Sequence, residues 1–118
     1  MAFVLTSLAP ATKGWAANIT GDLSACETIV AAPATGSLYL TQIVINCATA
    51  AQTVTVGAGE TASSVTAPVI GPITFGAEGN FYTATFLVPI KIAATTAITA
   101  DASGAGVVQI FAAGYTIL

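Results

Sequence analysis

The chain contains no histidine and no arginine, and its only cationic side chains are Lys13 and Lys91. Without histidine, no serine or cysteine nucleophile can be paired with an imidazole base. The usual zinc sites with histidine ligands are excluded as well, and two cysteines are too few for a four-cysteine site. Two lysines cannot build the basic surface that nucleic acids require. We therefore expect a protein without enzymatic activity, cofactor, metal or nucleic-acid partner.

Charged residues of either sign are scarce, at 6% of the chain, whereas soluble domains average about 25%. Hydrophobic residues make up 55%, which excludes intrinsic disorder. No Asp-x-Asp spacing typical of a calcium loop occurs. We interpret the carboxylates as solvated turn residues rather than as a calcium site or a hydrolytic pair. The five acids, which give a net charge of −3, are Asp22, Glu27, Glu60, Glu78 and Asp101.

Long hydrophobic runs are also missing. A helix that crosses a membrane needs about 20 mostly apolar residues. The longest apolar stretches, residues 38–47, 81–92 and 107–118, are shorter and are interrupted by polar residues, proline or lysine. Residues 1–10 lack the positive charge that begins a signal peptide. We expect no membrane partner, and the apolar residues must be buried in a core, at a subunit interface, or in both.

The chain is instead rich in Thr, Val and Ile, which favour strands, in short runs separated by Gly and Pro. No stretch combines helix caps with a helical hydrophobic period. The length of 118 residues fits one domain, residues 1–118. The sequence therefore predicts an all-β protein, a single-domain antiparallel sandwich of about seven or eight short strands.

The first half of the chain gives three local predictions. Residues 38–47 form a strand whose inward phase switches, which indicates a bulge near residues 41–42 or burial on both faces. Residues 52–56 alternate Thr and Val, and residues 43–56 could form a hairpin. The Gly-Ala-Gly at residues 57–59 lacks the third glycine and the following helix of a dinucleotide site, so we predict a hairpin turn there.

The second half gives four more predictions. Residues 69–75 contain Gly and Pro and should lie on a sheet edge or bend. Residues 81–92 alternate clearly, with an apolar face that runs from Tyr82 to Ile92. Residues 97–102 form the next strand, followed by a glycine-containing turn. Residues 107–118 are apolar on both faces, which indicates a central strand or one at a subunit interface.

Cys26, Cys47 and the N-terminal region leave alternatives open. The two cysteines could form a disulfide or remain buried thiols, and the lack of a secretory signal favours the thiols. Trp15 either fills one end of the sandwich or anchors a partner. Residues 1–17 are a candidate N-terminal arm, and within them residues 1–11 form either an arm that pairs with another subunit or an ordinary first strand. The candidate contacts with a capsid or a neighbouring subunit are Phe3, Val4, Leu5 and Trp15.

Residues 38–118 resemble small jelly-roll decoration proteins, also called cement proteins, of tailed bacteriophages. The resemblance rests on the runs LYLTQIVINCATAAQTVTVGAG and ITFGAEGNFYTATFLVPIKIAATTAITADASGAGVVQIFAAGYTIL. It implies a jelly-roll-like fold and a non-enzymatic virion protein, made in the host cytoplasm, on the outer capsid surface. Such proteins commonly form homotrimers that bind the major capsid protein and stabilise the shell. No functional residue can be transferred, because the resemblance has no motif that matches position by position.

Two other functions remain open. A head-fibre or tail subunit with the same sandwich would be present in few copies per virion. A glycan-binding β-sandwich would use aromatic platforms, for which Trp15, Tyr39, Tyr82 and Tyr115 are available. Both would be non-enzymatic, because the sequence offers no nucleophile with a matching base.

Overall fold

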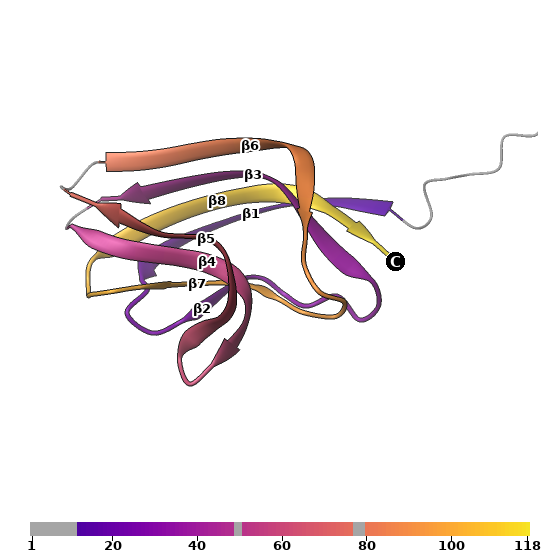
Figure 1. Ribbon diagram of the computed structural model, residues 1–118, viewed down its shortest axis with the longest axis horizontal. Coiled ribbons are helices and arrows are strands. Elements are labelled where there is room, and N and C mark those ends of the chain that lie inside the picture. The colour runs from indigo at the N-terminus through magenta and orange to yellow at the C-terminus, as the bar shows by residue number, and fades with distance from the viewer. Residues whose placement is uncertain (1–11, 49–50, 77–79) are drawn as a thin grey trace, which may run out of the picture.

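The computed structural model describes residues 12–48, 51–76 and 80–118 and forms a sandwich of two antiparallel sheets (Figure 1). Within these residues there are eight strands and no helix, so no helix is available that could span a membrane. The strands are β1 (Thr12–Asp22), β2 (Glu27–Val30), β3 (Ser37–Cys47), β4 (Gln52–Thr61), β5 (Ser64–Phe75), β6 (Asn80–Lys91), β7 (Ile98–Ala102) and β8 (Val107–Ile117).

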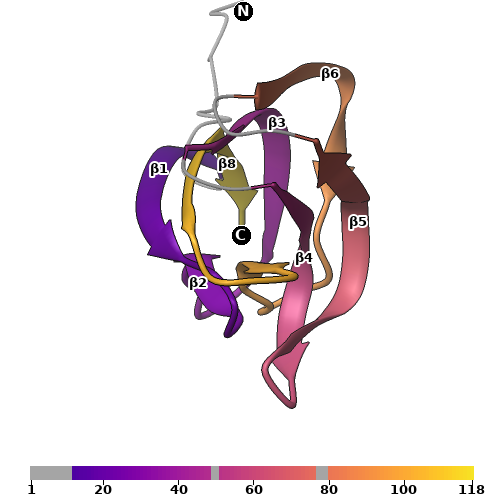
Figure 2. The same ribbon diagram turned by 90° about the vertical axis from the view of Figure 1, so that its left-hand side faces the viewer.

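The pairing of the strands is nested along the chain. β1 pairs with β8, β2 with β7, β3 with β6 and β4 with β5, all antiparallel. Two further pairings, of β3 with β8 and of β4 with β7, join these four strand pairs into two sheets. Their strand orders are β1-β8-β3-β6 and β2-β7-β4-β5. This nested order in two four-stranded sheets is the jelly-roll arrangement. The predicted all-β sandwich is confirmed, and Figure 2 views its two layers from one side.

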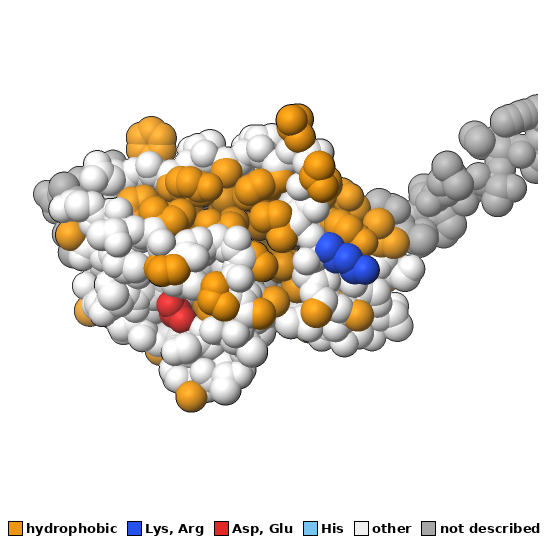
Figure 3. Space-filling view, viewed as in Figure 1, with side chains coloured by type: hydrophobic (Ala, Val, Ile, Leu, Met, Phe, Trp, Pro, Cys, Tyr) orange, Lys and Arg blue, Asp and Glu red, His pale blue; other side chains and the backbone are white. Residues whose placement is uncertain are grey.

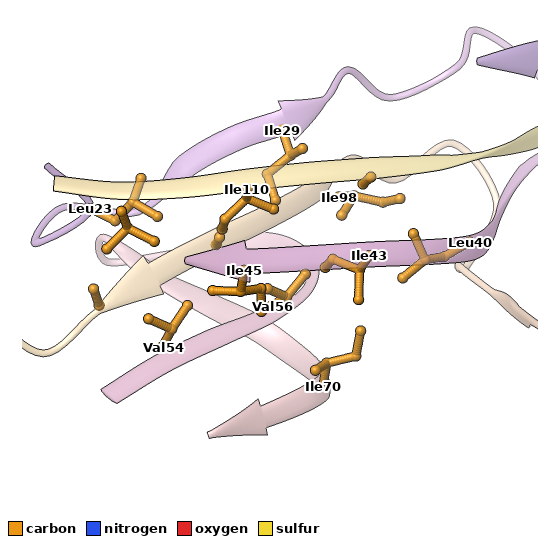
Figure 4. Close-up of a cluster of buried hydrophobic side chains, with 14 of the residues drawn as sticks. Leu23, Ile29, Leu40, Ile43, Ile45, Val54, Val56, Ile70, Ile98 and Ile110 are labelled. Atoms are coloured by element: carbon orange, nitrogen blue, oxygen red, sulfur yellow. The ribbon is translucent and has the colours of Figure 1, made fainter. Parts of the chain in front are cut away.

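The core lies between the two sheets and follows the period-two alternation of the strands (Figure 4). Ile43 and Ile45 of β3, Ile110 of β8, and Val54 and Val56 of β4 are all fully buried. Burying one such side chain stabilises the fold by about 1.5–3 kcal/mol. The predicted central position of residues 107–118 is confirmed, because β8 lies between β1 and β3.

The predicted bulge in the first long strand is also confirmed. The register of β3 shifts between Leu40 and Gln42 against both of its neighbours, β6 and β8. The extra residue is Thr41, whose hydroxyl donates a hydrogen bond of 3.0 Å to the carbonyl of Ala113. The bulge explains the phase switch, because Leu40 and Ile43 both face the core although an odd number of positions separates them.

The hairpin predicted over residues 43–56 is wrong, because β3 and β4 belong to different sheets. The turn predicted at residues 57–59 is also wrong, because these residues lie inside β4. The turn of the β4–β5 hairpin falls instead at Ala62 and Ser63, both of which have positive φ. Gly57 marks a close approach: a Cβ there would lie 2.6 Å from the Cγ1 of Val65 and 2.7 Å from the Cα of Pro68.

The sequence did not predict strand β1, which includes part of the N-terminal region. Of residues 1–17, the candidate N-terminal arm, residues 12–17 form the first half of β1, and residues 1–11 lie outside the described residues. The whole length of β1 pairs with β8. Small residues such as Ala and Gly have weak strand preference, and this pairing overrides it. Phe3, Val4 and Leu5 lie outside the described residues.

Candidate functional site

Two carboxylates of the described residues, those of Asp22 and Asp101, accept hydrogen bonds from the backbone. Among those residues no group of three or more His, Cys, Asp or Glu could hold a metal ion. Asp22 accepts a hydrogen bond of 2.8 Å from the backbone N–H of Ser24, which lowers the pKa of its carboxyl. Asp101 lies inside β7 rather than in a turn, so its interpretation as a turn residue is wrong. Glu78 lies outside the described residues.

Both cysteines are free, buried thiols. Cys26 precedes β2, and Cys47 is the last residue of β3. Burial raises the pKa of each thiol above its ordinary value. A reactive cysteine requires a lowered pKa and access to solvent, so neither thiol is placed as a nucleophile.

Strand β6 departs from β3 in the middle and forms a shoulder on the sandwich. Gln42 pairs with Thr85 and Leu40 with Ile90, so residues 86–89 have no partner on β3. We call residues 86–89 the β6 shoulder. The predicted alternation over residues 81–92 fails here: Val88 was expected on the inner face, but the bulge turns it outward and leaves it 82% exposed.

The β6 shoulder presents a concentrated apolar surface. Leu87 is 100% exposed and Val88 is 82% exposed, while Phe86 packs partly against the core. Figure 3 shows hydrophobic side chains in a band along this side of the molecule and as projections above it, with few charged side chains nearby. Single exposed apolar residues are ordinary on protein surfaces, whereas Leu87 and Val88 are two neighbouring exposed ones.

The outer edges on this side are protected against strand addition. On this side the two sheets end in the edge strands β6 and β5, and at the opposite edges they end in β1 and β2. β6 carries Pro89 within its bulge and Lys91 at its end, and β5 carries Pro68 and Pro72. Proline, lysine and bulges each prevent an edge from accepting another strand. This edge is therefore poorly suited to extension of the sheet by a further strand.

A second surface lies on the outer face of the sheet β1-β8-β3-β6. Eight side chains there, two from each strand, line a hollow of about 550 Å³ that we call the outer hollow. They form two cross-strand rows, read from β1 to β6: Asn18, Phe111, Val44 and Thr83, then Thr20, Gln109, Asn46 and Phe81.

The outer hollow is uncharged and combines amides, hydroxyls and phenyl rings. The side-chain N–H of Asn46 donates a hydrogen bond of 2.9 Å to the side-chain carbonyl of Gln109. The side-chain oxygen of Asn46 is buried and has no hydrogen-bond partner among the described residues. Phe81 is 71% exposed at the edge of the hollow. In the sequence, this outer face is indicated by alternation, because the lining residues of β3 and β8 alternate with buried residues such as Ile45 and Ile110.

The structure separates the aromatic residues that the sequence offered as platforms. Trp15 and Tyr82 point inward and pack against the core, Trp15 beside a largely apolar cavity of about 420 Å³ at one end of the sandwich. Tyr39 and Tyr115 are cross-strand partners whose rings stack, with centroids 5.1 Å apart and planes 9° apart. Phe81 and Phe111, which the sequence analysis did not select, are the rings that line the outer hollow.

No protein-family model matches the chain, and no curated protein sequence is significantly similar to it.

Proposed function

We propose that the chain is a non-enzymatic virion protein that decorates the outer surface of a phage head as a homotrimer and stabilises the shell. The observation that carries the proposal is the β6 shoulder, where the side chain of Leu87 is fully exposed and that of Val88 is largely exposed. The resemblance of residues 38–118 to capsid decoration proteins supplies the biological setting. The partners are further copies of the chain and the major capsid protein.

The energetics favour burial of the shoulder against protein. Removing one Leu or Val side chain from water stabilises an interface by about 1.5–3 kcal/mol. A trimer repeats the contact three times around a closed ring, so a modest contact per copy gives a stable assembly. Since only 6% of the chain is charged, little desolvation of charge opposes such contacts.

Stabilisation of the shell follows from linkage. A protein that binds the assembled shell, and not its free subunits, lowers the free energy of the assembled state by RT ln(1 + c/Kd) for each site, where c is its free concentration. Many copies add these contributions over the whole particle. No chemistry is needed for this role, which agrees with the absence of histidine and arginine from the sequence.

The direct test is co-sedimentation with heads assembled from the major capsid protein of the same genome. The proposal expects saturable binding in many copies per head, and heads that withstand higher temperature when saturated. The variant Leu87→Asp should bind much more weakly, whereas Ala67→Asp, an exposed charge on β5, should bind like the wild type. Absence of binding, or binding in only a few copies, would contradict the proposal and favour a fibre or tail subunit.

A further inference from the structure

We infer that the outer hollow is a binding site for a neutral saccharide, independent of shell binding. Its volume of about 550 Å³ falls within the roughly 300–1,000 Å³ typical of small-molecule sites. It lies on the outer face of the β1-β8-β3-β6 sheet, and its β6 residues, Phe81 and Thr83, precede the β6 shoulder on the same strand. None of the residues 86–89 lines the hollow, so variants of the two surfaces can be compared.

The charge of the lining defines the class of ligand. None of the eight lining side chains is ionisable, so an ionic ligand would lose its hydration without gaining a counter-charge. The polar groups are three amides and two hydroxyls, from Asn18, Asn46, Gln109, Thr20 and Thr83. Amides and hydroxyls both donate and accept, which suits a ligand whose own polar groups are hydroxyls.

The two phenyl rings supply the complementary apolar contact. Phe111 lies in the first row and Phe81 in the second, on opposite sides of β3. The face of an aromatic ring is slightly negative and attracts the weakly positive C–H groups on one side of a pyranose ring. Phe81 has the exposure that such stacking needs, since 71% of its surface is open.

Asn46 gives the site an unused acceptor. Its N–H group is engaged by Gln109, while its oxygen is buried without a partner among the described residues. A buried acceptor left unpaired destabilises the free protein. Because the oxygen is covered, a sugar hydroxyl can donate to it only after the Asn46 side chain rotates toward the hollow, and the new hydrogen bond then removes that penalty.

The test is an array of neutral and acidic oligosaccharides probed with the labelled full-length chain, followed by calorimetry with the neutral trisaccharide that binds best. The inference expects binding to neutral glycans only, little dependence on salt, and about tenfold weaker binding for Phe81→Ala. Asn46→Asp should weaken binding similarly. Leu87→Ala, on the same strand but outside the hollow, is the matched control and should bind normally.

Three results would overturn the inference. The first is an array without a neutral ligand. The second is binding that Phe81→Ala and Asn46→Asp leave unchanged while both variants keep the wild-type circular dichroism spectrum. The third is a fall in native mass for Phe81→Ala, which would assign the outer hollow to contact between copies of the chain. A failure of head binding leaves the saccharide result unaffected, so the two proposals are tested separately.

Discussion

The side chain of Asp101 in β7 accepts a hydrogen bond of 2.8 Å from the backbone N–H of Val65 in β5, although β4 lies between these strands. This hydrogen bond holds the start of β5 against the outer face of the β2-β7-β4-β5 sheet. Thr99 reinforces this arrangement with a hydrogen bond of 2.6 Å from its hydroxyl to the carbonyl of Gly59. The long β4–β5 hairpin is thus held by side chains of β7 as well as by its own ladder.

Replacing Asp101 by Ala should destabilise the fold by about 1–3 kcal/mol, because the N–H of Val65 loses a charged acceptor in a partly buried position. Urea unfolding of the two proteins measures the difference. Asp101→Asn keeps an oxygen in place and should recover part of the loss. Equal stability of Asp101→Ala and the wild type would show that the bond does not hold the hairpin.

Gly114 should tolerate no side chain. A Cβ at this position would collide with the backbone carbonyl of Tyr39 and lie 2.7 Å from the Cζ2 of Trp15. We expect Gly114→Ala to lower the free energy of unfolding by about 1–3 kcal/mol through overpacking. Gly14→Ala is the matched control, because its Cβ would meet only the Gly114 carbonyl at 3.9 Å and should change stability by less than about 0.5 kcal/mol.

Strands β3, β6 and β8 could be predicted because inward and outward residues alternate over much of their length. In β3 even the bulge at Thr41 left a visible shift of phase. The central position of β8 could be predicted because both of its faces are apolar. Such a strand is typical of the middle of a sheet, where it is paired with a neighbour on each side, here β1 and β3.

Other features could not be predicted because they depend on contacts between distant segments. β1 is held by its pairing with β8, and its own Ala and Gly residues have too weak a strand preference to predict a strand there. The sequence does not distinguish a glycine that forms a turn from one that leaves room for a neighbouring side chain, as Gly57 does for Val65. The outer hollow joins side chains from four strands, and only the jelly-roll order brings Asn18 beside Phe111 and Val44 beside Thr83.

Stability should decrease in alkaline solution because of the buried thiols. Burial raises the pKa of Cys26 and of Cys47, so the folded state favours the protonated form. This contribution is fully present below the unfolded thiol pKa of about 8.5 and is lost as the pH rises through the folded pKa. Urea unfolding at a series of pH values should give a negative slope above about pH 8.5. An identical slope in the Cys26→Ala, Cys47→Ala double variant would rule out the thiols as its cause.

Removal of residues 1–11, which include the candidate contacts Phe3, Val4 and Leu5, should weaken binding to heads. Because the described sandwich begins at Thr12, the thermal unfolding midpoint should stay close to that of the full chain. Co-sedimentation with heads measures the first effect and calorimetry the second. Unchanged head binding by the shortened chain would remove these residues from the capsid contact.

The native mass at micromolar concentration, measured by light scattering, tests the role of the β6 shoulder most directly. We expect a species of about 35 kDa, three times the chain mass of 11.6 kDa. Leu87→Asp should shift it toward the monomer without loss of fold, because this fully exposed side chain makes no contact that holds the sandwich together. Ala67→Asp should remain trimeric. A wild-type chain that stays monomeric, or a trimer that Leu87→Asp leaves intact, would contradict the assignment of the shoulder as the surface between copies.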